Sequence, residues 1–421
     1  MRTRSWWIIG IVGLIGALCL CGGLGVGIAA YRFLPEMLTR LPQATRPSPT
    51  PPQTRERTPP PPTPTTERIA TPERTATPLA SPTRALETPG SVRWRLRQEI
   101  PVEAFQMAVA PDGSRLAVGE SGQIRILDPR TNRELARFPV EEGVEVNRMA
   151  FSPDGRWLVV STGETVELLN LTAQTVDHVF FPTGQARAVA FSPQGTLVLV
   201  GTESHLIGYY LESRRPAFEF ELYGPGDAFV MDADERLIFQ ITRGETDMEV
   251  WDAYAGEGWG SIAFEPISAI ALSPDGQMLA VAENQQAEHP TYGMVLAPGR
   301  AALWRVEVNP DERDVTLQLQ AELDFPQETE GADLPVTLQQ LAFSPDGRWI
   351  AGIADWMGEG DTRGRLYLWE TATGRRLARE ILPGRPLGLG FVEDGAGLAV
   401  LLGTGAPVPV DHRIQIWTTA P

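Results

Sequence analysis

The sequence predicts an all-β protein whose folded part is a seven-bladed β-propeller, and three observations support this prediction. A motif of the form apolar-Ala-Phe-Ser-Pro-Asp-Gly, followed by an apolar run, recurs along the chain, with copies beginning at residues 107, 149, 189, 229, 270, 341 and 389. Their starts are separated by 42, 40, 40, 41, 71 and 48 residues. Each copy reads as strand, tight turn and strand. A period near 40 residues with this content is typical of propeller blades.

Within each copy, the first apolar half is expected to form strand A, Ser-Pro-Asp-Gly the A–B turn, and the second apolar run strand B. Pro and Asp suit the opening of a tight turn, and Gly provides the positive φ that closes it. The aspartates of these turns, Asp112, Asp154, Asp275 and Asp346, are therefore interpreted as turn formers and not as catalytic groups. Strand C is expected at 123–128, 165–170, 206–211, 247–252, 301–306, 365–370 and 413–418.

The two ends of the repeat region are expected to meet. The seventh copy ends at Trp417 with four residues left, so it has no strand D of its own. The segment 94–100 precedes the first copy and has the pattern of a strand D without a blade. If this N-terminal strand closes the last blade, the ring has no exposed edge there. The propeller is then predicted to occupy residues 92–421.

The repeats resemble the WD-repeat family of propellers, and the resemblance covers residues 92–421. Trp251-Asp252 reproduces the closing dipeptide of the family, whereas Trp304, Trp369 and Trp417 keep only the aromatic residue. The Gly-His pair of the family is missing, so the His–Ser–Trp network of its eukaryotic members is not carried over. The degenerate Ser-Pro-Asp-Gly form is more similar to bacterial propellers, including the periplasmic propeller of the Tol system. The resemblance implies binding to partners and not catalysis.

The N-terminal region has a different composition. Residues 6–31 contain no charged side chain and are long enough, as a helix, to cross the roughly 30 Å hydrocarbon core of a membrane. We predict a single transmembrane helix here, with residues 1–5 as a cytoplasmic flank; a cleaved signal peptide is the alternative. Gly23 and Gly27 form a Gly-x-x-x-Gly pattern, a weak indication of helix pairing and hence of oligomers.

The segment that follows is predicted to be a disordered stalk. Residues 32–91 are rich in proline and threonine, with 14 prolines between residues 42 and 90. Such a segment cannot bury an apolar core and favours extended polyproline II. An anchor followed by a spacer favours a cell-membrane protein with its propeller outside the cytoplasm; placement on the cytoplasmic face is the alternative.

The charge of the folded part excludes several functions. Residues 91–421 hold 26 arginines, no lysine and 48 acidic residues, a formal net charge of −22. Such a domain repels phosphate backbones, so no nucleic-acid partner is expected. Chemistry that requires a lysine is excluded because the chain has none. No cofactor, metal site or catalytic residue is predicted.

The candidate binding face lies on blades 5 to 7, where the B–C connections are long. These insertions are 283–300, 355–364 and 403–412, and the D–A connection 324–337 is also long. In a propeller these connections emerge on one face, and loops on a rigid scaffold often carry binding residues. The candidate residues mix apolar, acidic and histidine side chains: His289, Tyr292, Met294, Asp355, Trp356, Met357, Glu359, Asp361, Asp411 and His412.

The function that these observations predict is non-catalytic recognition of a protein or peptide partner, or assembly, on that face. Exposed aromatic and methionine residues are common anchors of such interfaces. The alternative is a hydrolase or lyase that acts on envelope glycans through paired carboxylates on the same face. The sequence has no Gly-x-Ser-x-Gly elbow.

Overall fold

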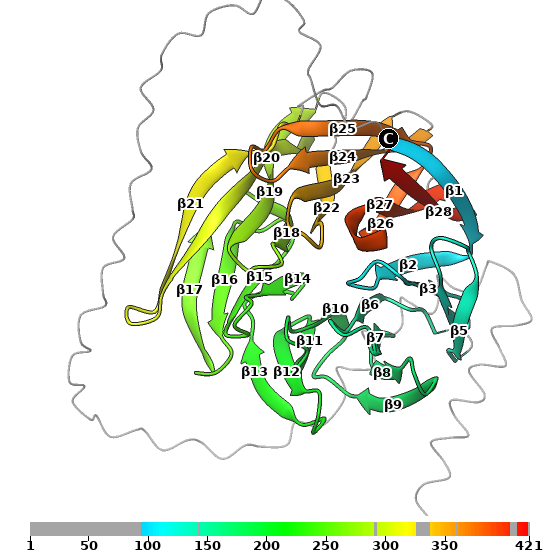
Figure 1. The fold of residues 1–421 in the computed structure, drawn as a ribbon. Helices are drawn as coiled ribbons and strands as arrows, with labels where there is room; N and C mark the ends of the chain where they lie inside the picture. The colour runs from blue at the N-terminus through cyan, green and yellow to red at the C-terminus, as the bar shows by residue number, and fades with distance from the viewer. Residues whose placement is uncertain are drawn as a thin grey trace, which may run out of the picture. The chain divides into compact units, whose positions relative to one another are not determined.

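The folded part of the chain is a ring of seven four-stranded antiparallel sheets (Figure 1). The computed structural model describes residues 94–141, 144–289, 293–325, 337–358, 361–404 and 411–419. The predicted flank, transmembrane segment and stalk all precede residue 94 and lie outside the described residues. Among the helices within these ranges, none has the length and apolar character needed to span a membrane.

The blades follow one another along the chain, with strands A to D running from the inside of the ring outward (Figure 1). Blade 1 holds β2 (Ala104–Val109), β3 (Leu116–Glu120), β4 (Gln123–Leu127) and β5 (Glu134–Pro139). Blade 2 holds β6 (Arg148–Phe151), β7 (Trp157–Ser161), β8 (Val166–Asn170) and β9 (Thr175–Phe180). Blade 3 holds β10 (Ala186–Phe191), β11 (Leu197–Thr202), β12 (His205–Tyr210) and β13 (Pro216–Glu221). Blade 4 holds β14 (Ala228–Met231), β15 (Leu237–Ile241), β16 (Asp247–Asp252) and β17 (Glu257–Ala263).

The last three blades have longer strands. Blade 5 holds β18 (Ile267–Leu272), β19 (Met278–His289), β20 (Gly293–Asn309) and β21 (Asp314–Glu322). Blade 6 holds β22 (Thr337–Phe343), β23 (Trp349–Gly358), β24 (Asp361–Glu370) and β25 (Arg376–Leu382). Blade 7 combines β26 (Arg385–Val392), β27 (Gly397–Thr404) and β28 (Asp411–Thr419) with β1 (Trp94–Val102), and the short 3-10 helix η2 (Glu393–Gly395) forms its A–B turn.

The A–B turns show why the Ser-Pro-Asp-Gly motif recurs. In blade 2, the Ser152 hydroxyl donates to Asp154 Oδ1 at 2.6 Å and accepts the Trp157 N–H at 2.9 Å. Asp154 Oδ1 also accepts the Arg156 N–H at 2.9 Å, and Gly155 has a φ of 64°. The same Ser–Asp bonds close the turns of blades 5 and 6, through Ser273 with Asp275 and Ser344 with Asp346. In blade 1, Asp112 bonds to Ser114 instead. The interpretation of these four aspartates as turn formers is confirmed.

The apolar core is divided among the junctions between blades. Seven buried clusters each combine side chains from two neighbouring blades. The cluster that joins blade 7 to blade 1 contains Ile414 and Ile416 of β28 together with Leu116 and Val118 of β3. Each blade therefore buries both faces against its neighbours, which explains the continuous apolar runs of the B strands.

The N-terminal strand closes the ring, as the sequence predicts. β1 pairs antiparallel with β28 from Trp94↔Thr419 to Val102↔His412, and in Figure 1 the two strands lie side by side at the outside of blade 7. Ile100 is only 1% exposed in the cluster between blades 7 and 1. The closure joins the two ends of the propeller by backbone hydrogen bonds and by apolar packing.

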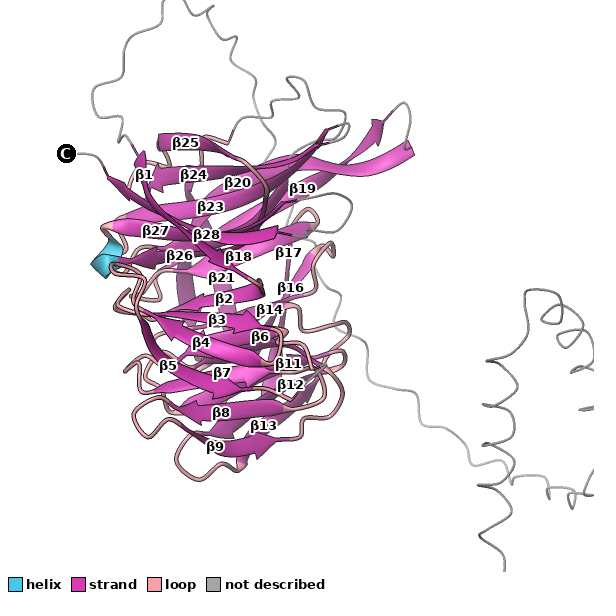
Figure 2. Cartoon of the chain, turned by 90° about the vertical axis from the view of Figure 1, so that its right-hand side faces the viewer, coloured by secondary structure: helices cyan, strands magenta, loops and turns pink. Residues whose placement is uncertain are grey.

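Two of the predicted loops are extended hairpins. β19 and β20 remain paired to His289↔Gly293, far beyond the last residues that pair with β18 and β21. β23 and β24 likewise remain paired to Gly358↔Asp361. Figure 2 shows the blade 5 hairpin projecting from the ring. The sequence predicted long loops at these connections, but the structure extends the B and C strands instead, because the two segments satisfy their backbone N–H and C=O groups by pairing with each other.

Candidate functional site

The D–A and B–C connections emerge on one face of the ring, which we call the DA–BC face. In Figure 2, the blade 5 hairpin, a B–C connection, projects on the side opposite η2, which is an A–B turn. The sequence placed the candidate binding residues on this face in blades 5 to 7. The structure adds a second group of residues on the same face in blades 1 to 4.

A cavity of about 550 Å³ opens on the DA–BC face of blades 1 to 4, and we call it the inner cavity. Its lining comes from the starts of the innermost strands and from the turns beside them. The residues that line it include Phe105, Gln106, Glu120, Val144, Glu145, Val146, Asn147, Arg148, Gln185, Arg187 and Asp227. Four successive repeats thus contribute equivalent positions to one site. A volume of this size is within the usual range for ligand pockets.

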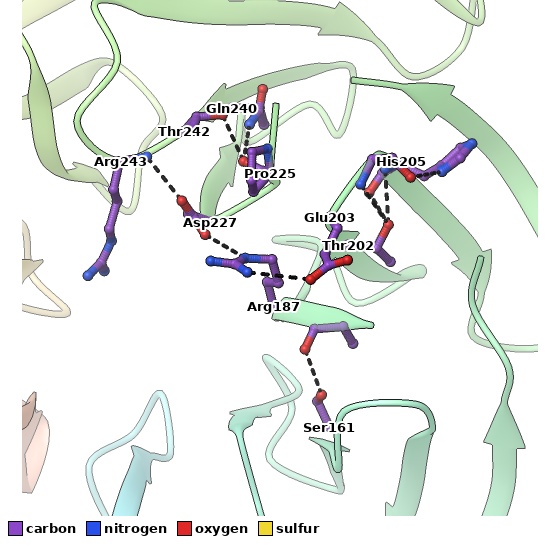
Figure 3. A network of polar contacts seen from close by, with 12 residues as sticks. Ser161, Arg187, Thr202, Glu203, His205, Pro225, Asp227, Gln240, Thr242 and Arg243 are labelled. Atoms are coloured by element: carbon purple, nitrogen blue, oxygen red, sulfur yellow. Dashed lines mark hydrogen bonds and ion pairs between the residues drawn. The ribbon is translucent and has the colours of Figure 1, made fainter. Parts of the chain in front are cut away.

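Asp227 organises one wall of the inner cavity (Figure 3). Its Oδ1 accepts a hydrogen bond from Arg187 Nε at 2.8 Å, and its Oδ2 accepts the backbone N–H of Arg243 at 3.2 Å. Arg187 Nη1 also lies 3.8 Å from Glu203 Oε1. The carbonyl of Pro225, two residues before Asp227, accepts the Thr242 hydroxyl at 2.8 Å. This network fixes the connection between β13 and β14 against the B–C turn of blade 4.

Arg148, in the lining of the inner cavity, and Arg243, in the B–C turn of blade 4, add positive charge to this face. Desolvation by the surrounding protein is the main cause that lowers the pKa of Arg148. The positive charges of Arg243 and Arg187 lower this pKa further, whereas the negative charge of Asp227 raises it. Desolvation likewise lowers the pKa of Arg243. The charges of Arg187, Arg243 and Asp227 thus all act on Arg148. We call Arg148, Arg187 and Arg243 the arginine cluster.

Aromatic side chains are exposed around this part of the face. Phe105, at the start of β2, lines the inner cavity and is 51% exposed. Phe181 follows β9 in a D–A connection and is 77% exposed, and Tyr223 follows β13 and is 98% exposed. Large aromatic side chains exposed to this extent are costly in water and are frequent at protein interfaces.

Most of the residues predicted for blades 5 to 7 are placed by their backbone alone or lie outside the described residues. Tyr292 and Glu359 belong to the second group. His289 pairs with Gly293 at the end of the blade 5 hairpin, Met294 pairs with Glu288, and Trp356, Met357 and Asp361 lie at the end of the blade 6 hairpin. Their role in binding stays a prediction.

Asp355, Asp411 and His412 are described in full. Asp355 Oδ2 accepts a hydrogen bond from Arg385 Nε at 3.0 Å, and burial raises the pKa of this carboxyl despite that partner. Asp411 pairs with Thr404 across β27 and β28 and is exposed. The His412 ring lies edge-on to Phe105, with centroids 4.4 Å apart. His412 therefore borders the inner cavity through Phe105 and connects the predicted residues with the site in blades 1 to 4.

The Trp251-Asp252 pair has a structural role. Asp252 is 1% exposed, and its Oδ1 accepts the N–H groups of Tyr254 and Ala255 at 3.0 and 2.8 Å. Its Oδ2 accepts Arg236 Nε at 2.9 Å. These bonds hold the C–D turn of blade 4 on the opposite face. Within the described ranges, no group of three or more His, Cys, Asp or Glu side chains is placed to hold a metal ion.

Comparison with known proteins supports the repeat type. Residues 134–167 match the WD40 family, described as WD domain, G-beta repeat. The match runs from β5 of blade 1 to β8 of blade 2, so one sequence repeat is shared between two blades. Propellers built from WD40 repeats are generally non-catalytic scaffolds that bind protein partners.

Two relatives illustrate how far the similarity extends. The chain is 23% identical over 228 residues to "Periodic tryptophan protein 2 homolog" of Mus musculus, which covers 48% of this chain and 24% of that protein. It is 33% identical over 122 residues to "Centriole proteome protein 16" of Chlamydomonas reinhardtii, which covers 27% of this chain and 6% of that protein. The chain thus spans about a quarter or less of the relatives it matches.

The arginine cluster lies outside the long insertions on which the sequence prediction of a binding face was based. Arg148, Arg187 and Asp227 stand one or two positions before the motif in three consecutive copies. The charged residues that recur at this position could have indicated the site from the sequence. In a propeller, the starts of neighbouring A strands converge at the inside of the ring, so such residues meet although they are about 40 positions apart.

Proposed function

We propose that this protein is a membrane-anchored, non-catalytic recognition platform whose propeller binds a protein partner through its DA–BC face. The single observation that carries the proposal is the exposure of Phe105, which lines the inner cavity, and of Phe181 and Tyr223, which follow the D strands of blades 2 and 3 on the same face. The WD40-type repeat supports protein binding as the mode of action. The candidate residues of blades 5 to 7 extend the proposed interface along the same face.

The proposed location rests on the N-terminal sequence. The 26 uncharged residues 6–31 would anchor the chain, and the proline-rich segment 32–91 would hold the propeller away from the membrane. We propose that the propeller lies outside the cytoplasm. Proteolysis of intact cells tests this directly: the propeller should be released without lysis. Release only after lysis would contradict the proposed topology.

The binding face is tested by capturing partners from membranes with the full chain and its variants. A protein that binds the DA–BC face should be recovered with the wild type and lost with the double variant Phe181→Ala/Tyr223→Ala, since buried aromatic anchors contribute about 2–4 kcal/mol each. The control is Tyr254→Ala, which removes a 74% exposed aromatic from the opposite face. Recovery that is equal in all three proteins would contradict the proposed face.

A further inference from the structure

The outermost strand of blade 5, β21, is an edge strand without the usual protection against pairing. Edge strands in proteins are commonly kept from pairing by charged side chains, proline, glycine or short length. In β21, residues 315–321 read Val-Thr-Leu-Gln-Leu-Gln-Ala, so no charged residue, proline or glycine lies between Asp314 and Glu322. The other six outermost strands each contain such a residue: Arg137 in β5, Asp177 in β9, Glu219 in β13, Gly258 and Gly260 in β17, Arg379 in β25 and Arg97 in β1.

β21 also has the longest unbroken pairing among the outermost strands. Six successive pairs, from Asn309↔Asp314 to Trp304↔Leu319, join it to β20 before the register shifts at Gln320. The other six outermost strands have at most five successive pairs. A regular strand of this length presents the N–H and C=O groups of its free side in an even row. Among the described strands, none pairs with this side of β21.

The ribbon formed by β20 and β21 extends beyond the rest of blade 5. β19 pairs with β20 up to Arg305, so β21 is the one described strand that pairs with the stretch from Val306 to Asn309. Val315 and Leu317 of β21 pack, partly buried, into the cluster between blades 4 and 5. In Figure 1, β21 lies at the outer margin of the ring. A two-stranded ribbon is only marginally stable, so a third strand on the outer side would stabilise it.

We propose that β21 accepts an extended segment of a partner protein, which adds a fifth strand to blade 5 and carries basic residues at its two ends. This inference goes beyond the proposed function because it adds a second interaction surface at the outer edge of the ring. In such strand addition, backbone hydrogen bonds provide affinity and alternate side chains provide specificity. Val315, Leu317 and Leu319 alternate with Thr316 and Gln318, so the added segment should alternate apolar and polar residues in the same way.

The charge around β21 favours basic ends on the added segment. Residues 300–322 carry three arginines and five acidic residues: Glu307, Asp311, Glu312, Asp314 and Glu322. Two of the arginines pair with acids outside this stretch, Arg313 with Glu257 at 2.7 Å and Arg300 with Glu283 at 3.1 Å. Asp314 and Glu322 are exposed at the two ends of β21, and Glu322 lies 4.0 Å from Arg300, at the limit of an ion pair. Basic residues opposite these two ends would stabilise the added strand.

The same charges disfavour a second copy of this chain as the added strand. Two copies related by a twofold axis would pair β21 with itself antiparallel, which sets Asp314 of each copy against Glu322 of the other. Like charges that lie directly opposite each other in a sheet are destabilising. The net charge of −22 on residues 91–421 adds to the repulsion between copies. A basic-ended segment of a different protein therefore fits this edge better.

The test measures binding of labelled peptides to the full chain in detergent by fluorescence anisotropy at about 50 mM salt, where screening is moderate. The probe is Lys-Val-Thr-Ile-Thr-Val-Lys, which alternates as β21 does and has basic ends. One matched peptide has N-methyl groups on its internal amides and cannot complete the ladder; the other, Glu-Val-Thr-Ile-Thr-Val-Glu, has acidic ends. Each should bind at least about tenfold more weakly than the probe. Equal affinity of either matched peptide would overturn the inference.

Variants of the chain test the two ends of β21. Asp314→Asn and Glu322→Gln should each weaken binding of the probe about threefold, as expected for one exposed ion pair, and the double variant should weaken it about tenfold. The matched control is Glu221→Gln, which removes the same charge from an exposed position at the end of β13, the outermost strand of blade 3. It should leave the affinity within twofold. An equal loss in the control would overturn the inference, because the peptide would then respond only to the overall charge.

Hydrogen exchange of the full chain locates the added strand. With saturating probe, exchange should slow at least about tenfold at about half of the backbone amides of residues 314–322, because successive N–H groups of a strand point to opposite sides. Exchange in residues 216–221 of β13 should not change. Protection elsewhere with none in β21 would overturn the inference. Protection of β21 in the chain alone, rising with protein concentration, would show that a second copy occupies the edge and would also overturn it.

The outcomes separate this inference from the proposed function. Phe181→Ala/Tyr223→Ala changes the DA–BC face and should leave binding of the probe within twofold. If the probe does not bind while this aromatic variant loses its captured partner, the DA–BC face stands and the β21 inference is overturned. If the probe binds and protects β21 but the aromatic variant captures partners normally, the β21 inference stands and the aromatic interface is wrong.

Discussion

Closure of the ring by β1 leads to a quantitative prediction for Ile100. Its side chain is 1% exposed and lies in the cluster between blades 7 and 1. Ile100→Ala removes three buried carbons, which costs about 2.4 kcal/mol at about 0.8 kcal/mol per buried CH₂. The remaining cavity adds to this, so we expect a loss of about 3–4 kcal/mol in the free energy of unfolding, within the range measured for such substitutions.

The assay is urea unfolding of the full chain, followed by tryptophan fluorescence. The control is Leu96→Ala in the same strand, where the side chain is 42% exposed and a loss below about 1 kcal/mol is expected. Both variants keep the backbone bonds of β1 to β28, so the comparison isolates apolar packing at the closure. A loss below about 1 kcal/mol for Ile100→Ala, or equal losses for the two variants, would refute the role of this strand in the core.

Two further predictions concern the turns. Hydrogen bonds from Ser273 and the Gln277 N–H hold the pKa of Asp275 below its ordinary value of 3.8, so the stability that this carboxylate contributes is present at neutral pH and is lost as the pH falls below about 4. Asp275→Asn should therefore flatten the pH dependence of the unfolding free energy between about pH 5 and pH 2, and it should cost less than about 1 kcal/mol at pH 7 because the group is exposed. Parallel curves of unfolding free energy against pH for the variant and the wild type would contradict this. Gly113 has a φ of 63°, and a Cβ added there would clash with the backbone N of Glu393 in blade 7, so Gly113→Ala should lower the unfolding free energy by about 3 kcal/mol. The control is Gly122→Ala, since Gly122 has a φ of 76° with open space around it and its substitution should cost about 1 kcal/mol. Equal losses in the two variants would show that the contact between blades 1 and 7 does not contribute to stability.

The sequence was sufficient to predict the ring because its information is local and repeated. Ser152 and Asp154 make the same bonds within their turn that Ser344 and Asp346 make within theirs, so each copy specifies its own strand–turn–strand unit. Segment 94–100 was identified as the closing strand because one blade lacked a fourth strand. The number of strands predicted in each blade was enough to identify it.

The parts that the sequence did not predict depend on which segments pair with each other and on how the ring brings separate blades together. Residues 283–300 contain polar residues, two prolines and two glycines, all typical of a loop, yet most of them pair with each other in the β19–β20 hairpin. The arginine cluster depends on the ring itself. Arg148 and Arg187 lie at the starts of the inner strands of blades 2 and 3, and Arg243 lies in the B–C turn of blade 4, so only the closed ring brings them to one face.

The central claim is that the DA–BC face over blades 1 to 4 is the surface that meets a partner. The most direct measurement is site-specific photo-crosslinking in cells, with a benzoylphenylalanine placed at Tyr223 or, as a control, at Tyr254 on the opposite face. The account predicts a discrete crosslinked partner from position 223 and none from position 254. The same partner crosslinked from position 254, with no product from position 223, would contradict it.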